Sequence, residues 1–357
     1  MKYAYLFLLF FGCLFVACDP DEEPAVYDST PAPLSFGNFP TPMIPADNTP
    51  TIAGVMLGRM LFFEKKLSKD GSQACADCHR QPNGFSDSLQ FSIGVAGLPG
   101  KRQAMPIMNL AWHKNGMFWD GRSPLMRDQA LKPIQDALEM NETLANAIAK
   151  LAADKTYTDQ FIRAFGDGNI TEERIGKAIE QFEMTMISNN ARYDKWQRGE
   201  VTLTDSEERG RKMFFAEFSP SGAQKGAECF HCHGGFNFTN DQYMNNGLDA
   251  DADQTDEGRM KVTLDAADMA KFKTPSLRNI AHTAPYMHDG RFGTLEAVIE
   301  HYNTDTHASA TADPLLQYNL QPGGLQLNAA DKADLLAFLH ALTDTDFLTN
   351  PAFKSPF

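Results

Sequence analysis

Apolar side chains in this chain recur every three to four residues, a spacing that gathers them on one face of an α-helix. Residues 171–188 follow this pattern with four positions: Ile175, Ile179, Phe182 and Met186. A second stretch near the C-terminal end carries Leu335, Leu336, Leu339 and Leu342. Thr204 and Glu207 have the spacing of a capping box, which starts a helix. No long run alternates apolar and polar residues, so the pattern predicts an all-α protein.

The pattern occurs twice, because two halves of the chain share sequence features in the same order. Gly58-Arg59-Met60-Leu61-Phe62-Phe63 corresponds to Gly210-Arg211-Lys212-Met213-Phe214-Phe215. Pro106 precedes Asp120-Gly121-Arg122 by 14 positions, and Pro275 precedes Asp289-Gly290-Arg291 by the same interval. A duplicated domain explains both observations. We therefore predict two tandem helical domains, joined near residues 189–203, where the periodicity breaks.

The first 50 residues predict an export signal followed by a linker. After Lys2, an uncharged apolar run over residues 3–17 is too short for a membrane span, and it ends at Cys18. Residues 15–18 resemble a bacterial lipobox, in which the cysteine is lipidated; a cleaved signal without a lipid is the alternative. Residues 19–50 hold eight of the 20 prolines and are expected to be a tether. The predicted divisions are 1–18, 19–50, 51–195 and 196–357.

Each predicted domain contains one Cys-x-x-Cys-His motif: Cys75, Cys78 and His79 in the first, and Cys229, Cys232 and His233 in the second. Two such cysteines can add to the vinyl groups of a porphyrin, and the adjacent imidazole then ligates the iron. A four-cysteine zinc site is a weaker interpretation, because its pairs normally lie within about 15 to 20 residues. A thioredoxin-like dithiol would need a preceding strand, whereas residues 69–73 have a loop composition. We expect one covalent haem c per domain.

The net charge and the remaining two cysteines limit which partners and covalent links are expected. The net charge of −14 argues against nucleic acid and is compatible with a basic protein partner. Cys13 and Cys18 lie in the signal region, so no disulfide is expected. Since no later stretch could span a membrane, a lipid on Cys18 is the one membrane contact that the sequence predicts.

Together, these motifs resemble those of the bacterial di-haem cytochrome c peroxidases and their relative MauG. The resemblance extends from about Gly58 to Thr343 and rests on both haem motifs and on Phe118-Trp119-Asp120-Gly121-Arg122, Gln129, Glu139-Met140 and Pro285-Tyr286-Met287-His288-Asp289-Gly290. It implies two cytochrome c-like domains, with the peroxide site at the first haem and electron entry through the second.

The resemblance also implies roles for three residues. Gln129 and Glu139 match residues that line the distal pocket of the first haem, where a carboxylate can move a proton between the two oxygens of peroxide. The alternative for Glu139 is a solvated carboxylate at a helix end. Trp119 matches a tryptophan that lies between the haems and assists electron transfer, and packing in the core is an equal alternative.

The chain departs from the family pattern at three positions. Val95 stands where many members have a histidine that closes the first haem, so that haem is expected to be open in the oxidised protein. Gln103 replaces an asparagine that binds calcium between the haems, while Thr283 and Pro285, whose carbonyls would be the other ligands, are kept. Calcium is therefore a possible third cofactor, neither required nor excluded by these residues. Tyr302 stands at the position of the methionine that ligates the second haem.

Tyr302 is the expected second ligand of that haem, and Met287 and His301 are the alternatives. Residues 294–303 are predicted to form a helix with an apolar face of Leu295, Val298 and Ile299. Tyr302 continues this face, whereas His301 is turned about 100° away. A buried tyrosine beside a methionine-ligated haem is the competing interpretation.

From these observations we predict an exported c-type peroxidase that reduces hydrogen peroxide with electrons from a small redox protein, either a cytochrome c or a cupredoxin. The alternative is a MauG-like oxidase that acts through high-valent iron on a protein or small-molecule substrate. A third interpretation is a pure electron carrier with both haems closed. We expect the protein in the periplasm or anchored by lipid to a bacterial membrane. The sequence does not determine its oligomeric state, and a homodimer is one option.

Overall fold

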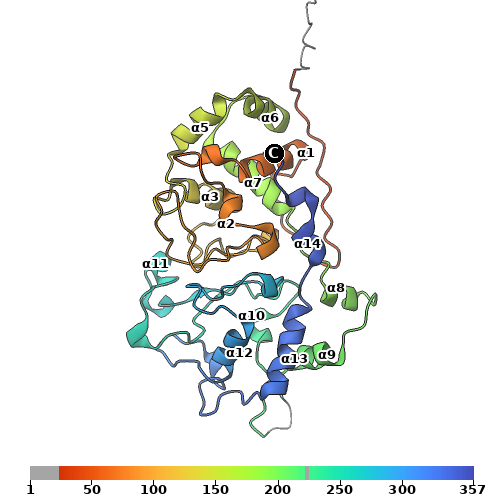
Figure 1. Ribbon diagram of the computed structural model, residues 1–357, viewed down its shortest axis with the longest axis vertical. Helices are drawn as coiled ribbons and strands as arrows, with labels where there is room; N and C mark the ends of the chain where they lie inside the picture. Colours follow the sequence, from red (N-terminus) through yellow and green to blue (C-terminus); the bar gives the residue numbers. More distant parts are fainter. Residues whose placement is uncertain (1–23, 222–224) are drawn as a thin grey trace, which may run out of the picture.

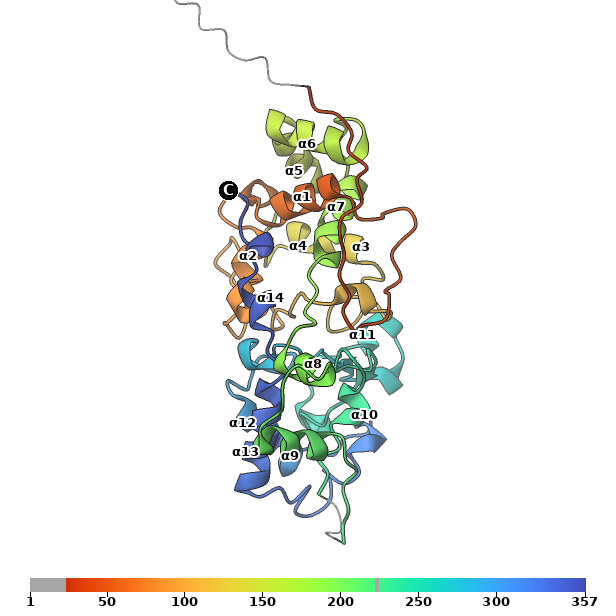
Figure 2. The same cartoon turned by 90° about the vertical axis from the view of Figure 1, so that its right-hand side faces the viewer.

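The structure, a computed structural model, describes residues 24–221 and 225–357. The molecule is elongated, with two helical halves stacked along its long axis: α1 to α7 in the upper half of Figure 1 and α8 to α13 in the lower half. After α13 the chain returns through α14 to the upper half, where the C-terminus lies beside α1 (Figures 1 and 2).

Within the described residues, regular structure is almost entirely helical. The first half contains α1 (Ile52–Phe62), α2 (Cys75–Cys78), α3 (Met126–Ala130), α4 (Lys132–Gln135), α5 (Leu144–Ala152), α6 (Lys155–Phe165) and α7 (Glu172–Met184). The rest of the chain contains α8 (Arg192–Gln197), α9 (Asp205–Phe214), α10 (Phe230–His233), α11 (Met260–Thr263), α12 (Leu295–Asn303), α13 (Ala329–His340) and α14 (Thr345–Thr349). Two short antiparallel strands, β1 (Tyr243–Met244) and β2 (Phe272–Lys273), pair Tyr243 with Lys273. The all-α prediction is confirmed.

Each half is built on one pair of closely packed helices, α1 with α7 and α9 with α13. A Cβ on Gly58 would lie 1.9 Å from the backbone oxygen of Ala178 in α7. A Cβ on Gly210 would lie equally close to the backbone oxygen of Asp334 in α13. Only glycine permits such an approach. The glycines that open the two repeated sequence motifs therefore produce the same helix crossing twice.

The second repeated segment also folds alike in both halves. Asn109 and Asn279 both have a left-handed backbone, with φ of 55° and 54°. The turn that follows is closed each time by an antiparallel bridge: Met117 with Ser123, and Tyr286 with Phe292. The duplication predicted from the spacing of proline and aspartate is thus present in the backbone.

Two predicted helices are present and begin after capping threonines, although α7 ends at Met184, before the end of the predicted stretch 171–188. α7 follows Thr171, whose Oγ1 accepts a hydrogen bond from the Arg174 N–H at 3.2 Å, and it ends before Met186, which is still fully buried. Thr204 and Glu207 form the predicted capping box of α9. The joint between the halves, predicted as aperiodic, contains the short helix α8.

Two terminal segments run across both halves. The composition of residues 19–50 predicts a tether, yet residues 24–50 pack onto the body of the protein. Phe39 is buried between Trp112 of the first half and Phe236 of the second, with ring centroids 5.4 and 4.7 Å away. A proline-rich segment has too few apolar residues for its own core, but single aromatic side chains can still enter another. α14 also packs on the first half, although it lies within the predicted range 196–357.

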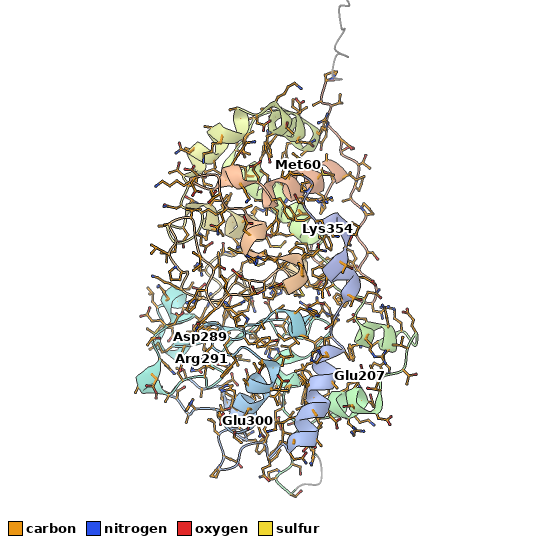
Figure 3. All side chains as sticks on the ribbon, viewed as in Figure 1. Met60, Glu207, Asp289, Arg291, Glu300 and Lys354 are labelled. Carbon is orange, nitrogen blue, oxygen red and sulfur yellow. The ribbon has the colours of Figure 1, made fainter. Side chains whose placement is uncertain are left out.

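Side chains fill the interior of both halves (Figure 3). In that view Asp289 and Arg291 lie together in the lower half, near the junction, and their side chains form an ion pair with an N–O distance of 2.7 Å. Among the described residues, no helix is long and apolar enough to cross a membrane. The predicted signal and Cys18 lie outside the described residues.

Candidate haem sites

The first haem motif places a histidine with one ring nitrogen engaged and the other free for a metal. Cys75 and Cys78 lie at the two ends of α2, and His79 follows directly. His79 Nδ1 is 2.8 Å from the backbone oxygen of Phe85, which fixes the ring and leaves Nε2 as the ligand atom. Burial lowers the pKa of His79, so the imidazole is neutral, as a ligand must be.

The second motif repeats this arrangement in α10. His233 Nδ1 lies 3.2 Å from the backbone oxygen of Phe238, and burial lowers the pKa of His233 to about 4. The four motif cysteines form no disulfide among the described residues, so all four sulfur atoms can attach haem. Each site thus offers two thiols and a neutral, oriented imidazole beside a cavity, which is the donor set that a covalently attached haem requires.

The predicted catalytic residues line the cavity that contains His79. Glu139 and Gln129 both lie on its wall, together with Arg122 of the repeated Asp-Gly-Arg triplet. Burial raises the pKa of Glu139 to about 7, helped by the negative charge of Asp136 and opposed by the positive charge of Arg122. Glu139 is thus partly buried and lines the cavity, in contrast to a fully solvated carboxylate. A carboxyl group with this pKa gains and loses protons near neutral pH.

The backbone of Glu139 is held by the loop that contains Val95. The Val95 N–H donates to the Glu139 carbonyl at 2.9 Å. A Cβ on the preceding residue, Gly94, would lie 2.1 Å from the Leu138 carbonyl oxygen and 2.6 Å from that of Glu139. Ser92, Ile93 and Gly94 line the cavity. The loop thus forms part of the distal wall, and the openness of the first haem in the oxidised protein stays a prediction.

Trp119 lines both cavities. It is buried, and its Nε1–H donates to the Gln103 carbonyl at 2.8 Å, so the indole has a single orientation. Gln103 is itself buried and lines the second cavity together with Thr283 and Pro285. The three residues suggested for calcium therefore lie around one space. A calcium ion in this space stays a prediction.

Tyr302 and Met287 both face the second cavity, which also contains His233. The Asn246 side-chain amide lies between them, 3.2 Å from Tyr302 Oη and 3.3 Å from Met287 Sδ. His301 is turned away, as predicted, and its Nε2 lies 3.1 Å from the Asn246 carbonyl oxygen. The helix is the predicted one, α12, with Thr294 as its N-cap. Tyr302 and Met287 thus remain the two candidate ligands, and Tyr302 is the one we predict.

Sequence reasoning missed two polar clusters that contribute residues to the wall of the first cavity. Arg102 binds Asp256 through two hydrogen bonds of 2.7 and 2.8 Å and Asp120 through a third of 2.7 Å. Asp241 accepts from the buried Lys273 ammonium at 2.5 Å and lies 2.9 Å from His113 Nδ1. Both clusters join residues more than 120 positions apart, so no local pattern reveals them.

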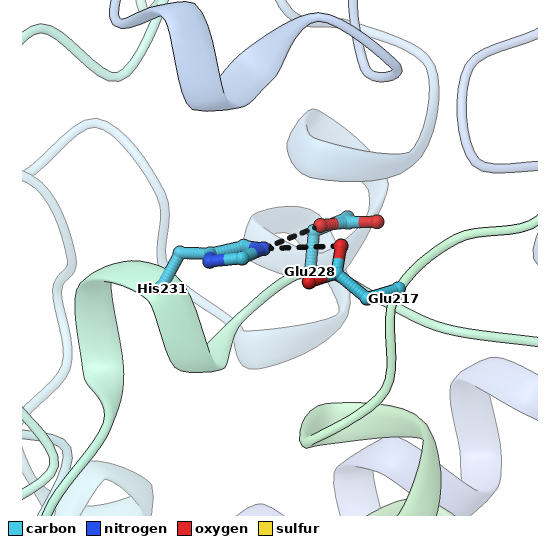
Figure 4. Close-up of side chains that lie close together, drawn as sticks. All are labelled: Glu217, Glu228 and His231. Atoms are coloured by element: carbon cyan, nitrogen blue, oxygen red, sulfur yellow. Dashed lines mark hydrogen bonds and ion pairs between the residues drawn. The ribbon is translucent and has the colours of Figure 1, made fainter.

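His231 occupies a variable position of the second haem motif and takes part in a separate contact. Its Nε2 lies 2.8 Å from a carboxylate oxygen of Glu228 and 3.3 Å from one of Glu217 (Figure 4). A hydrogen bond between the imidazole and these carboxylates accounts for the arrangement.

Comparison with known proteins identifies the family of this chain. Residues 52–202 match the family model described as di-haem cytochrome c peroxidase. The chain is 35% identical to the methylamine utilization protein MauG of Methylophilus methylotrophus, over 90% of this chain and 88% of that protein. The chain belongs to the di-haem cytochrome c peroxidase family. A cytochrome c551 peroxidase of Nitrosomonas europaea is 33% identical over 84% of this chain and 81% of its own.

A solved structure shares the family fold. It is a MauG-like protein associated with microbial copper homeostasis, with 34% identity, a TM-score of 0.80, and coverage of 89% of this chain and 97% of its own. The protein is therefore a di-haem peroxidase-type oxidoreductase, and its cofactors are two haem c groups. The predicted family and fold class are both confirmed.

Proposed function

We propose that this protein reduces hydrogen peroxide to water in the cavity of His79, with electrons delivered one at a time by a small redox protein to the second haem. The reaction consumes one peroxide, two electrons and two protons and yields two water molecules. The observation that carries the proposal is the common cavity of His79, Glu139 and Gln129, in which Glu139 has a raised pKa. When bound, the haem supplies an iron that accepts a peroxide oxygen and stores oxidising equivalents.

The side chains around the cavity supply proton transfer and orientation. The Glu139 carboxylate takes the proton from the peroxide oxygen nearer to the haem and gives it to the outer oxygen, which then leaves as water. The Gln129 amide, with a donor and an acceptor, orients the peroxide. Trp119 offers a flat aromatic system between the two cavities for electron transfer.

The substitution Glu139→Gln tests this assignment. It preserves volume but removes the proton acceptor, so peroxide turnover should fall by at least about 100-fold, the lower end for a lost acid–base group. The resting spectrum should stay unchanged, because Glu139 is not proposed as a ligand. Glu172→Gln, on an exposed carboxylate of the same half, is the matched control. Unchanged turnover in Glu139→Gln would show that another group moves the proton.

A second candidate function is oxidation of a protein or small molecule in the manner of MauG. Tyr302 on the wall of the second cavity favours it, because a hard anionic ligand stabilises higher oxidation states of iron and makes that haem a poor acceptor from a high-potential cytochrome. Peroxide consumption in the absence of any cytochrome or cupredoxin would support this function. A pure electron carrier would show neither a high-spin ferric band nor peroxide turnover.

The donor and the location follow from charge and the N-terminal sequence. A net charge of −14 suits a basic donor protein, and the rate of donor oxidation should then fall as ionic strength rises. Export would follow from the apolar run before Cys18, with a lipid on Cys18 as the anchor. Cys18→Ser should then release the protein from the membrane fraction. A protein that is soluble without this change would instead support simple cleavage of the signal.

A further inference from the structure

The last residues of the chain pack against the first haem motif, although the second half precedes them in sequence. Phe347 of α14 and Phe353 are 2% and 5% exposed. They share one apolar cluster with three aromatic residues of the first half: Phe62, Phe85 and Phe182. Figures 1 and 2 both show this segment running from the lower half to a position beside the upper half.

Polar contacts hold the backbone of this segment in place. The Gln81 side-chain amide, two residues after His79, donates to the carbonyls of Phe347 and Asn350 at 3.0 and 2.9 Å. Arg59 of α1 donates to the carbonyl of Lys354 at 2.7 Å and to that of Pro351 at 3.0 Å. Because every acceptor is a backbone oxygen, the contacts depend on the path of the segment rather than on its side chains.

Phe85 connects this segment to the haem ligand. Its ring is fully buried, with centroids 5.5 Å from Phe347 and 6.1 Å from Phe353. Its backbone has a φ of 59°, a conformation that bulky residues rarely adopt and that surrounding packing must maintain. Its carbonyl lies 2.8 Å from His79 Nδ1. The packing of the ring therefore fixes the direction of the hydrogen bond from His79.

We propose that residues 345–357 position His79 by holding Phe85, and thereby lower the reduction potential of the first haem. A hydrogen bond from Nδ1–H to a carbonyl raises the electron donation of the imidazole to iron, and this stabilises the ferric state. Gln81, Phe347 and Phe353 are positioning residues in this arrangement. The proposal rests on the assignment of His79 as the proximal ligand in the proposed function.

The second half provides an internal control. Phe238 has a φ of 51° and its carbonyl faces His233, as Phe85 faces His79. Its ring packs against four aromatic residues, all of the second half: Tyr193, Phe214, Phe215 and Phe338. A change in the C-terminal segment should therefore affect the first haem and spare the second.

The experiment is a redox titration of both haems, with resonance Raman measurement of the iron–histidine stretch, in the full-length holoprotein. Phe347→Leu weakens the packing on Phe85, and Gln81→Met removes both amide contacts with little change in volume. Each should raise the potential of the first haem, lower its iron–histidine frequency and leave the second haem unchanged. Phe357→Leu, on a side chain that is 70% exposed, should change neither haem.

If the Phe347→Leu variant does not fold, the Gln81→Met variant tests the proposal alone, because the Gln81 substitution creates no cavity in the aromatic cluster. Equal shifts of both haems, or no shift of the first in a folded variant, would overturn the proposal. The expected shift together with absent peroxide turnover in the wild type would support the role of the segment and count against the proposed function.

Discussion

The two halves of this protein share the aromatic packing that supports each haem-ligand histidine. They differ in the other side chains that line the two cavities. Behind His79, Phe85 packs with Phe62, and Phe62 packs with Phe182 of α7. Behind His233, three phenylalanines at equivalent places repeat the arrangement: Phe238, Phe214 and Phe338 of α13. Both copies therefore share the helix crossing, a phenylalanine with a left-handed backbone conformation, and the carbonyl of that phenylalanine facing the histidine.

The opposite walls of the two cavities have different chemistry. The first carries a carboxyl group with a raised pKa and an amide, Glu139 and Gln129. The second carries Tyr302 and Met287, whose oxygen and sulfur atoms can bind iron. The duplicated fold thus repeats the setting of the haem-ligand histidine, and we propose that the different cavity side chains give the two haems different roles.

Removing one haem at a time tests the different roles of the two halves and should have the largest effect. Cys75→Ala with Cys78→Ala should leave one haem per chain and abolish peroxide turnover, because the peroxide site is lost. Cys229→Ala with Cys232→Ala should also leave one haem, but peroxide should still change the spectrum of the first. Haem staining and the pyridine haemochrome measure the haem content, and rapid mixing with peroxide measures the response. A peroxide response that survives only in the first variant would reverse the assignment.

Moving the wall that holds Glu139 should have the next largest effect. Gly94→Ala introduces a Cβ within 2.1 Å of the Leu138 carbonyl oxygen, so the loop or Glu139 must shift. Misplacement of a catalytic group by about 1 Å can cost 100-fold, and we expect a loss of about 10- to 100-fold in turnover. Gly100→Ala in the same loop meets only ordinary contacts of 3.6 Å and should retain activity. Equal activities of the two variants would show that the loop does not position Glu139.

A smaller effect is expected on the pH dependence of turnover. The unprotonated carboxylate is the active form, and burial raises the pKa of Glu139 to about 7, so turnover should rise with pH through about 7. An ordinary glutamate would already be ionised at pH 6. Arg122→Gln removes a charge that lowers this pKa and should move the profile upward; Asp136→Asn removes one that raises it and should move the profile downward. Shifts of the same sign in both variants would contradict this account.

Much of what the two halves share could be predicted from sequence, because it depends on local patterns. The capping box of Thr204 and Glu207, the helix crossing at the repeated glycines and the direction of Tyr302 each follow from residues within one helix or turn. Glu139 and Gln129 are assigned from the resemblance, in which they follow Trp119 by twenty and ten positions. Their common cavity appears only when the chain is folded.

The parts that sequence did not reveal depend on contacts between distant residues. Phe347 and Phe353 are apolar residues near the chain end, and nothing in their spacing says that they pack on the first half rather than the second. Asn246, between Tyr302 and Met287, lies in a loop without a recognisable motif. The burial of Phe39 was not predicted either. A proline-rich composition describes the average property of a segment and does not show whether a single aromatic side chain is buried.

The smallest expected effect concerns stability, and it asks whether the two halves unfold as one. Thr171 caps α7 through its Oγ1, and Thr204 caps α9 in a reciprocal pair with Glu207. Thr171→Ala and Thr204→Ala should each cost about 1 kcal/mol of the free energy of unfolding. If more than 300 residues unfold as one unit, that corresponds to a fall in Tm of about 1 to 2 °C. Because residues 24–50 and 345–357 bridge both halves, we expect either variant to lower one common calorimetric transition. Thr171→Ser and Thr204→Ser, which retain the hydroxyl, should restore most of the loss. Two transitions, each lowered only by the variant in its own half, would show that the bridging segments do not couple the halves.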